Sequence, residues 1–236
     1  MTPSLSPHAQ AMLDYWHGDV EGGCAIHRDD GYSYPVPIAA FFAGPPFNPL
    51  EQLALERSTG RVLDVGACVG RHSLFLQEHG CQVTAIELEP ALVAIMSERG
   101  VREPLAGSVF SLVGRQFDTM LMLLNGFGLV GTPDGADAFF EHTRQLLSPG
   151  GQILCDSVDV RQTTKPTHLA YQEANIRSGR PVGERRYWME YRGRRGEPFN
   201  WLHMDFDGLR DIARRHGWSA EMLAREEDGH YLARIS

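Results

Sequence analysis

The sequence predicts an α/β fold built on a doubly wound, mostly parallel sheet. The first observation is that short apolar segments alternate with amphipathic ones between residues 61 and 160, and again from residue 206. The second is that the apolar segments are continuous, as in strands that helices bury on both faces. Open sheets of this kind bind ligands at the carboxyl ends of their strands, so we expect a site at that edge.

The first 49 residues precede this alternation. Residues Ser4 to His17 can form a short amphipathic helix, and "RDDGYSYPVP" holds a D-D-G turn and prolines that indicate a hairpin or a loop. The stretch "AGPPFNP", Ala43 to Pro49, predicts a linker. We therefore expect an N-terminal lid or substrate segment at 1–49 and the main domain at 50–236.

Strands and helices then follow in turn, with proline opening one helix and glycines closing others. The predicted strands are "RVLDVG" (61–66), "CQVTAIE" (81–87), "FDTMLMLL" (117–124) and "QILCDSV" (152–158). The predicted helices are "RHSLFLQEHG" (71–80), "PALVAIMSERG" (90–100) and "DGADAFFEHTRQLLSPGG" (134–151).

The alternation stops after Val160, where a polar stretch leads to two strands around "RGRRGE". We expect an inserted β-hairpin at about 161–204, before the last elements: a helix at 206–217 and strands at 219–228 and 229–235. Insertions of this kind commonly build substrate pockets. The arginine-rich stretch 177–195 is either a solvated hairpin or an anion-binding patch.

Composition excludes several classes of protein. The net charge of −8 disfavours nucleic acid as a partner, and no apolar run approaches the roughly 20 residues that cross a membrane. The start "MTPSLSPHAQ" lacks the features of a signal peptide. The four cysteines have no C-x-x-C pair, which favours free thiols, no metal site and a cytoplasmic location.

The stretch "VLDVGACVG", Val62 to Gly70, predicts a cofactor-binding turn. A dinucleotide turn of the form G-x-G-x-x-G would need glycine at Cys68 and Arg71, and Asp64 would repel a pyrophosphate. S-adenosylmethionine has no phosphate and carries a sulfonium and an ammonium, so Asp64 would attract it. Gly66 lets the chain leave the strand sharply.

Other residues extend this interpretation. Gly70 lets the next helix pack close to the sheet, and Glu87 follows the next strand, 21 positions after Gly66. That spacing suits an acid that accepts hydrogen bonds from two ribose hydroxyls. The alternative is that Glu87 caps a helix or lies on the surface. If Glu87 binds the ribose, we expect the adenosine to lie across the tips of the first three strands.

The sequence resembles the class I S-adenosylmethionine-dependent methyltransferases over Gly60 to Asp159 and from Phe206 onward. The segments that carry the resemblance are "VLDVGACVG", "AIELEP", "FDTMLMLLNGFGLVG" and "LLSPGGQIL". The resemblance implies a Rossmann-like sheet of seven strands whose last strand is antiparallel, with S-adenosyl-L-methionine as the cofactor. It implies these cofactor-binding residues: Asp64, Gly66, Ala67, Cys68, Gly70, Glu87, Leu88, Ser108, Val109, Leu124, Asn125 and Gly126.

Two positions depart from the family pattern. Cys68 stands where the family has its middle glycine, and we expect it to be a packing thiol with a negative φ rather than a nucleophile. Ser108 stands where an acid often binds the adenine amino group, so backbone groups of Ser108 and Val109 would make that contact. "D/N-P-P-Y", typical of enzymes that methylate amino groups of nucleic acids, is absent after the fourth strand.

The predicted reaction is in-line methyl transfer to a small-molecule acceptor, which needs no strong base. Asn125 either orients the acceptor or only caps its loop. His27, Asp30 and His203 are candidate bases. The aromatic residues that either wall the acceptor pocket or pack in the core are Tyr15, Trp16, Tyr32, Tyr34, Trp188, Tyr191 and Trp201. The alternatives are a non-catalytic S-adenosylmethionine-binding partner and a nucleotide-binding protein, and a homodimer is possible.

Overall fold

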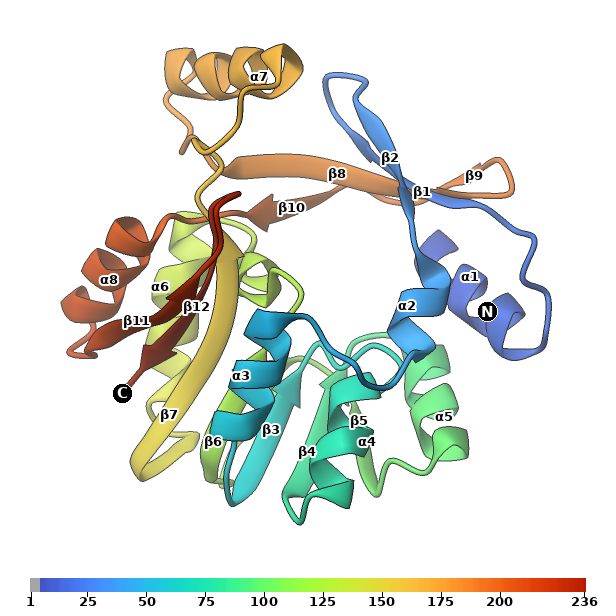
Figure 1. Ribbon diagram of the computed structural model, residues 1–236, viewed down its shortest axis with the longest axis vertical. Coiled ribbons are helices and arrows are strands. Elements are labelled where there is room, and N and C mark those ends of the chain that lie inside the picture. Colours follow the sequence, from blue (N-terminus) through green and yellow to red (C-terminus); the bar gives the residue numbers. More distant parts are fainter. Residues whose placement is uncertain (1–4) are drawn as a thin grey trace.

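A computed structural model describes residues 5–236, and its larger sheet has seven strands in the order β11, β12, β7, β6, β3, β4, β5 (Figure 1). Five of these strands are parallel, and β12 is antiparallel to both β7 and β11. The strands are β3 (Arg61–Val65), β4 (Gln82–Glu87), β5 (Glu103–Ala106), β6 (Phe117–Met122), β7 (Leu147–Val158), β11 (Ala220–Arg225) and β12 (His230–Ile235). The predicted fold class is confirmed.

Helices cover both faces of this main sheet. Helices α3 (Pro49–Arg57) and α4 (Arg71–Glu78) pack on one face, and α6 (Pro133–Thr143) and α8 (Phe206–Arg215) pack on the other. Helix α5 (Pro90–Arg99) lies against β4 and β5. The 3-10 helices η1 (Val109–Ser111) and η2 (Gly126–Val130) follow β5 and β6 at the carboxyl edge.

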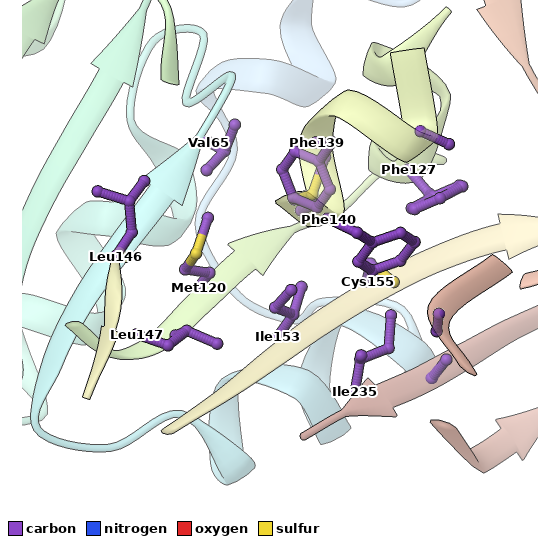
Figure 2. Close-up of a cluster of buried hydrophobic side chains, with 14 of the residues drawn as sticks. Val65, Met120, Phe127, Phe139, Phe140, Leu146, Leu147, Ile153, Cys155 and Ile235 are labelled. Atoms are coloured by element: carbon purple, nitrogen blue, oxygen red, sulfur yellow. The ribbon is translucent and has the colours of Figure 1, made fainter. Parts of the chain in front are cut away.

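The larger part of the core lies between the sheet and α6. Figure 2 shows Phe139 and Phe140 of α6 beside Met120 and Ile153 of the sheet, all of them buried. Burial of such large side chains contributes about 1.5–3 kcal/mol each. The predicted helix at 134–151 is wrong at its end, because the chain from Leu147 already belongs to β7, where it pairs with Phe117.

A second, antiparallel sheet joins the two segments that lie outside the alternation. Its order is β10, β8, β1, β2, with the short β9 beside β8. The strands are β1 (Cys24–Arg28), β2 (Ser33–Val36), β8 (Glu184–Tyr191), β9 (Arg194–Arg195) and β10 (Phe199–Leu202). The N-terminal stretch, predicted as a hairpin or a loop, is a hairpin, and the predicted inserted hairpin exists. The two form one sheet, because β1 pairs with β8 along its whole length.

This second sheet lies beyond the end of the main sheet toward which the arrows of β3 and β4 point (Figure 1). At one end, α1 (Pro7–Trp16) contacts both β8 and α5; α2 (Ile38–Phe42) packs with α1. At the other end, β10 contacts η2, and α7 (Pro166–Arg177) precedes β8. Across residues 5–236, no helix has the length and apolarity to span a membrane.

Candidate active site

The turn after β3 depends on two glycines. Gly66 has φ of 72°, and a Cβ there would lie 2.6 Å from Cδ1 of Leu129 in η2. Gly70, the N-cap of α4, has φ of 78°, and a Cβ there would lie 2.7 Å from Cγ2 of Val101. Both glycines therefore combine a left-handed backbone with close packing; at Gly70 the neighbours are Met96 of α5 and Val101, not the sheet as predicted.

Cys68, between these glycines, has φ of 52°, so the predicted negative φ is wrong. Its backbone N–H donates to Oε2 of Glu87 at 3.0 Å, which holds the residue in this left-handed conformation. The thiol packs against the cluster around α1, and burial together with the Glu87 carboxylate raises its pKa. A thiol that stays protonated is a poor nucleophile, which agrees with a packing role.

The left-handed φ of Cys68 predicts how its replacement changes the stability of the protein. Cys68→Gly should unfold with a free energy no lower than that of the parent, because a non-glycine residue in this region costs about 1–2 kcal/mol. The methyl transfer that the resemblance implies should stay within about tenfold of the parent, since the turn would work through backbone groups. Cys68→Val is the control and should lose about 2 kcal/mol. Urea unfolding measures both; a folded Gly variant without activity would show that the thiol is needed.

Glu87 links the β3 turn to the end of β4. Besides Cys68, its carboxylate accepts the N–H groups of Leu88 at 2.7 Å and Glu89 at 3.2 Å. The side chain therefore orders its own loop, and it lies at the strand end where the ribose interpretation places it. Burial raises its pKa.

Three acids at the carboxyl edge have no basic partner. Asp64, Glu87 and Asp156 lie at or near the ends of β3, β4 and β7, and no Lys, Arg or His nitrogen of residues 5–236 is within 4.0 Å of them. Ser73 donates to Asp64 at 2.6 Å. Burial raises the pKa of all three. Such an edge repels phosphates and favours a cationic ligand.

Asp156 was not among the predicted residues, although "QILCDSV" places an acid near the end of an apolar strand just as "VLDVG" does. It stabilises a turn after β6 in which Leu124 and Asn125 have φ of 65° and 58°. The N–H of Gly126 donates to Oδ1 of Asp156 at 2.9 Å. Oδ1 of Asn125 is buried and has no hydrogen-bond partner in the described chain, so Asn125 has an acceptor free for a ligand.

The pKa of Asp156, raised to about 6 by burial, predicts a pH effect on stability. The folded state holds the proton more tightly than the unfolded state, so ionisation lowers the parent's unfolding free energy as the pH rises toward 6. Asp156→Asn cannot ionise. Its stability relative to the parent should therefore increase by about 2 kcal/mol between pH 4.5 and 7.5. Urea unfolding at both pH values tests this; a difference that stays constant would contradict it.

The predicted adenine-binding residues lie in η1 and just before it. The Ser108 hydroxyl accepts the N–H of Phe110 at 3.3 Å, and the carbonyl of Val109 accepts from Nε2 of His142 at 2.9 Å. Several apolar side chains at this edge are exposed, namely Leu88, Phe110, Leu124 and Leu129. Phe110 and Leu129 could not be recognised from the sequence, because exposure of an apolar residue in a loop has no periodic signal.

The register of the second sheet shows which side chains face the main sheet. Trp201 lies opposite Arg185, and its indole leaves no room for a Cβ at Gly128 in η2. The face that carries Trp201 is therefore turned toward the carboxyl edge. We call it the inner face; it includes Arg28, Tyr34, Arg185, Tyr187 and Trp201.

The three candidate bases have different surroundings. His27 is on the opposite face, stacked on Trp188 with ring centroids 5.5 Å apart. Asp30 forms an ion pair with Arg28 at 2.6 Å, which lowers its pKa. Both are poor candidates. His203 follows β10, where its backbone bonds Gly183, and its buried Nδ1 has no partner in the described chain. Burial and Arg185 lower its pKa to about 3, so the ring is neutral at pH 7.

The aromatic residues divide in the same way. Tyr34 and Trp201 belong to the inner face. The others pack elsewhere: Tyr15 and Trp16 against Phe42, Tyr32 against His168, Trp188 between His27 and Arg195, and Tyr191 against α1 with its hydroxyl on Asp14.

Comparisons with known proteins agree with this geometry. The family model of the methyltransferase domain matches residues 62–151. A S-adenosylmethionine-dependent methyltransferase from Bacteroides fragilis, solved with S-adenosyl-L-homocysteine, is 33% identical, with a TM-score of 0.86 over 98% of this chain and 94% of that one.

More distant structures share the fold. The CcbJ methyltransferase from Streptomyces caelestis is 12% identical, with a TM-score of 0.64 over 98% of this chain and 97% of that one. A complex named DhpI-SAM-HEP is 21% identical, with a TM-score of 0.58 over 80% of this chain and 84% of that one. No curated protein sequence matches the chain.

Proposed function

The chain belongs to the class I S-adenosylmethionine-dependent methyltransferases, and on this premise we propose that its acceptor is a small molecule held between the carboxyl edge and the inner face. The supporting observation is that the second sheet lies over this edge and contacts the main domain at both ends, through α1 and α5 and through β10 and η2. The net charge of −8 also disfavours a nucleic-acid acceptor.

The cofactor would bind along the carboxyl edge through the predicted residues. The carboxylate of Asp64 compensates the positive charge of the methionyl part, and Glu87 accepts the ribose hydroxyls. The exposed Leu88 and Phe110 offer apolar surface to the adenine. The glycine turn would offer backbone N–H groups and the N-terminus of α4 to the carboxylate of the cofactor.

When bound, S-adenosylmethionine would supply a methyl group on a cationic sulfur for in-line transfer to a lone pair of the acceptor, with S-adenosylhomocysteine as the leaving group. The protein mainly orients the acceptor and excludes water. Oδ1 of Asn125 can accept a hydrogen bond from the acceptor or the cofactor. The neutral His203 is a positioning residue that can bond the acceptor through Nδ1.

Radiolabelled S-adenosylmethionine tests the proposal. The enzyme is incubated with a cell extract separated into a low-mass fraction and a polymer fraction, and the label transferred to each is counted. We expect label in the low-mass fraction only, with the Glu87→Ala variant as the control for cofactor-dependent transfer. Label confined to protein or RNA would overturn the small-molecule acceptor; binding of the cofactor without transfer to either fraction would favour a non-catalytic partner.

A further inference from the structure

Arg185 is a buried cation without a counter-ion. Arg185 is 4% exposed, and no carboxylate of residues 5–236 lies within 4.0 Å of its guanidinium. Nη1 donates to the carbonyls of Val182 at 2.8 Å and Glu184 at 3.1 Å, and the ring of Tyr171 is 4.9 Å from Cζ. Nε and Nη2 have no acceptor in the described chain, so an edge of the guanidinium fork is free.

The surroundings compensate this charge only in part, because Asp30 attracts the guanidinium from beyond 4.0 Å and is already paired with Arg28. Arg28, the other buried arginine of the inner face, already forms an ion pair with Asp30, and its Cζ lies 4.2 Å from the ring of Tyr171. The hydroxyl of Tyr171 donates a hydrogen bond to Asp29, so it does not supply a negative charge to Arg185. A buried guanidinium without an anion is unfavourable unless a partner is supplied from outside.

The strand that carries Arg185 is linked to the reacting edge. Gly183, two residues before it, bonds the backbone of His203, and the next N–H, that of Met204, donates to Ser157 Oγ at 3.0 Å. Ser157 follows Asp156, which holds the turn of Asn125 and Gly126. The inner face at Arg185 is thus joined by successive hydrogen bonds to the part of the edge where the acceptor would react.

We propose that Arg185 binds an oxyanion, a carboxylate or a phosphate, carried by the methyl acceptor. This assignment rests on the proposed function and adds a substrate class to it. The planar fork of arginine bonds both oxyanions in a bidentate manner, and burial strengthens such a pair. Trp201, opposite Arg185, would form an apolar wall beside the anion.

Anion binding can be measured without knowing the acceptor. The parent, Arg185→Gln and Arg186→Gln are saturated with S-adenosylhomocysteine and titrated with inorganic phosphate and, separately, acetate at constant ionic strength, with tryptophan fluorescence as the readout. Arg186 is the matched control, because it is exposed on the opposite face. We expect at least one anion to bind the parent, at least tenfold weaker binding to Arg185→Gln, and less than a twofold change in Arg186→Gln.

The preferred anion identifies the source as phosphate or carboxylate. The proposal is overturned if neither anion binds the parent, or if Arg185→Gln binds as the parent does. Should Arg185→Gln not fold, Arg185→Lys decides: it keeps the charge but loses the fork, so binding should weaken at least threefold, and unchanged binding would contradict the proposal. The affinity for S-adenosylhomocysteine, measured on the same samples, should not change.

The same variants separate this inference from the proposed function. Failure of the small-molecule function appears as label in the polymer fraction, whatever the anion titration shows. If only the anion site fails, label appears in the low-mass fraction, and Arg185→Gln has the same KM for the acceptor as the parent. If both proposals hold, Arg185→Gln raises the KM for the acceptor at least tenfold and changes kcat less, because the anion is bound equally in the ground and transition states.

Discussion

Glu87→Ala should weaken the binding of S-adenosylmethionine about 5- to 150-fold. That range corresponds to about 1–3 kcal/mol, the effect of leaving hydrogen-bonding groups of the ligand without a partner. The variant also releases the N–H groups of Cys68, Leu88 and Glu89, so the β3 turn should become less ordered. Isothermal titration calorimetry with S-adenosylmethionine and S-adenosylhomocysteine measures the effect.

A control and an analogue separate the two roles of Glu87. Glu89→Ala removes the same charge two residues away and should bind within about twofold of the parent, since no side-chain hydrogen bond caps the helix there. The 2′-deoxy analogue of S-adenosylhomocysteine tests the ribose contact. It should bind the parent more weakly than S-adenosylhomocysteine but bind Glu87→Ala about equally. Equal binding of both ligands by the parent would leave Glu87 only its role in the loop.

Gly70→Ala is expected to lower the free energy of unfolding by about 2–4 kcal/mol. The left-handed backbone contributes about 1–2 kcal/mol. The remainder is overpacking, because the new Cβ would meet Val101 Cγ2 at 2.7 Å and Met96 Cγ at 3.2 Å. Cofactor affinity should fall as well, since the N-terminus of α4, which follows the cofactor turn, would shift relative to α5.

Gly80→Ala is the matched control for this variant. Gly80 also has a left-handed φ, of 89°, but a Cβ there would meet nothing within 4 Å. Gly80→Ala should therefore lower the free energy of unfolding, measured in urea, by about 1–2 kcal/mol, and it should leave cofactor binding unchanged. If Gly70→Ala lost no more than Gly80→Ala, close packing of α4 would not be the reason for glycine at position 70.

The main sheet could be predicted because its strands are local and buried on both faces. "RVLDVG" and "CQVTAIE" are each a continuous apolar run followed by a helix, so both the strands and the positions of Gly66 and Glu87 follow from neighbouring residues. β5 and α7 were missed. β5 has four half-buried or exposed residues, and α7 has no clear apolar face in a stretch that is mostly polar.

Features that depend on distant contacts could not be predicted. The φ of Cys68 is positive because Glu87 holds its N–H, and no property of cysteine indicates that. The inner face arises only when β1 pairs with β8. The different faces of His27 and Arg28 and the burial of Arg185 therefore have no signal in the local sequence. The arginine-rich stretch 177–195 contains both exposed and buried arginines, and composition alone cannot distinguish them.

The pairing of β1 with β8 has a consequence for how the molecule folds. Cys24 pairs with Tyr191, and the five parallel strands of the main sheet all lie between these two residues in the sequence. Such a long loop makes the pairing slow, and the hairpin of β1 and β2 alone is marginally stable. We expect the cofactor edge to form first and the acceptor-binding face to complete it last, so the nascent enzyme acquires its cofactor site before it acquires its selectivity.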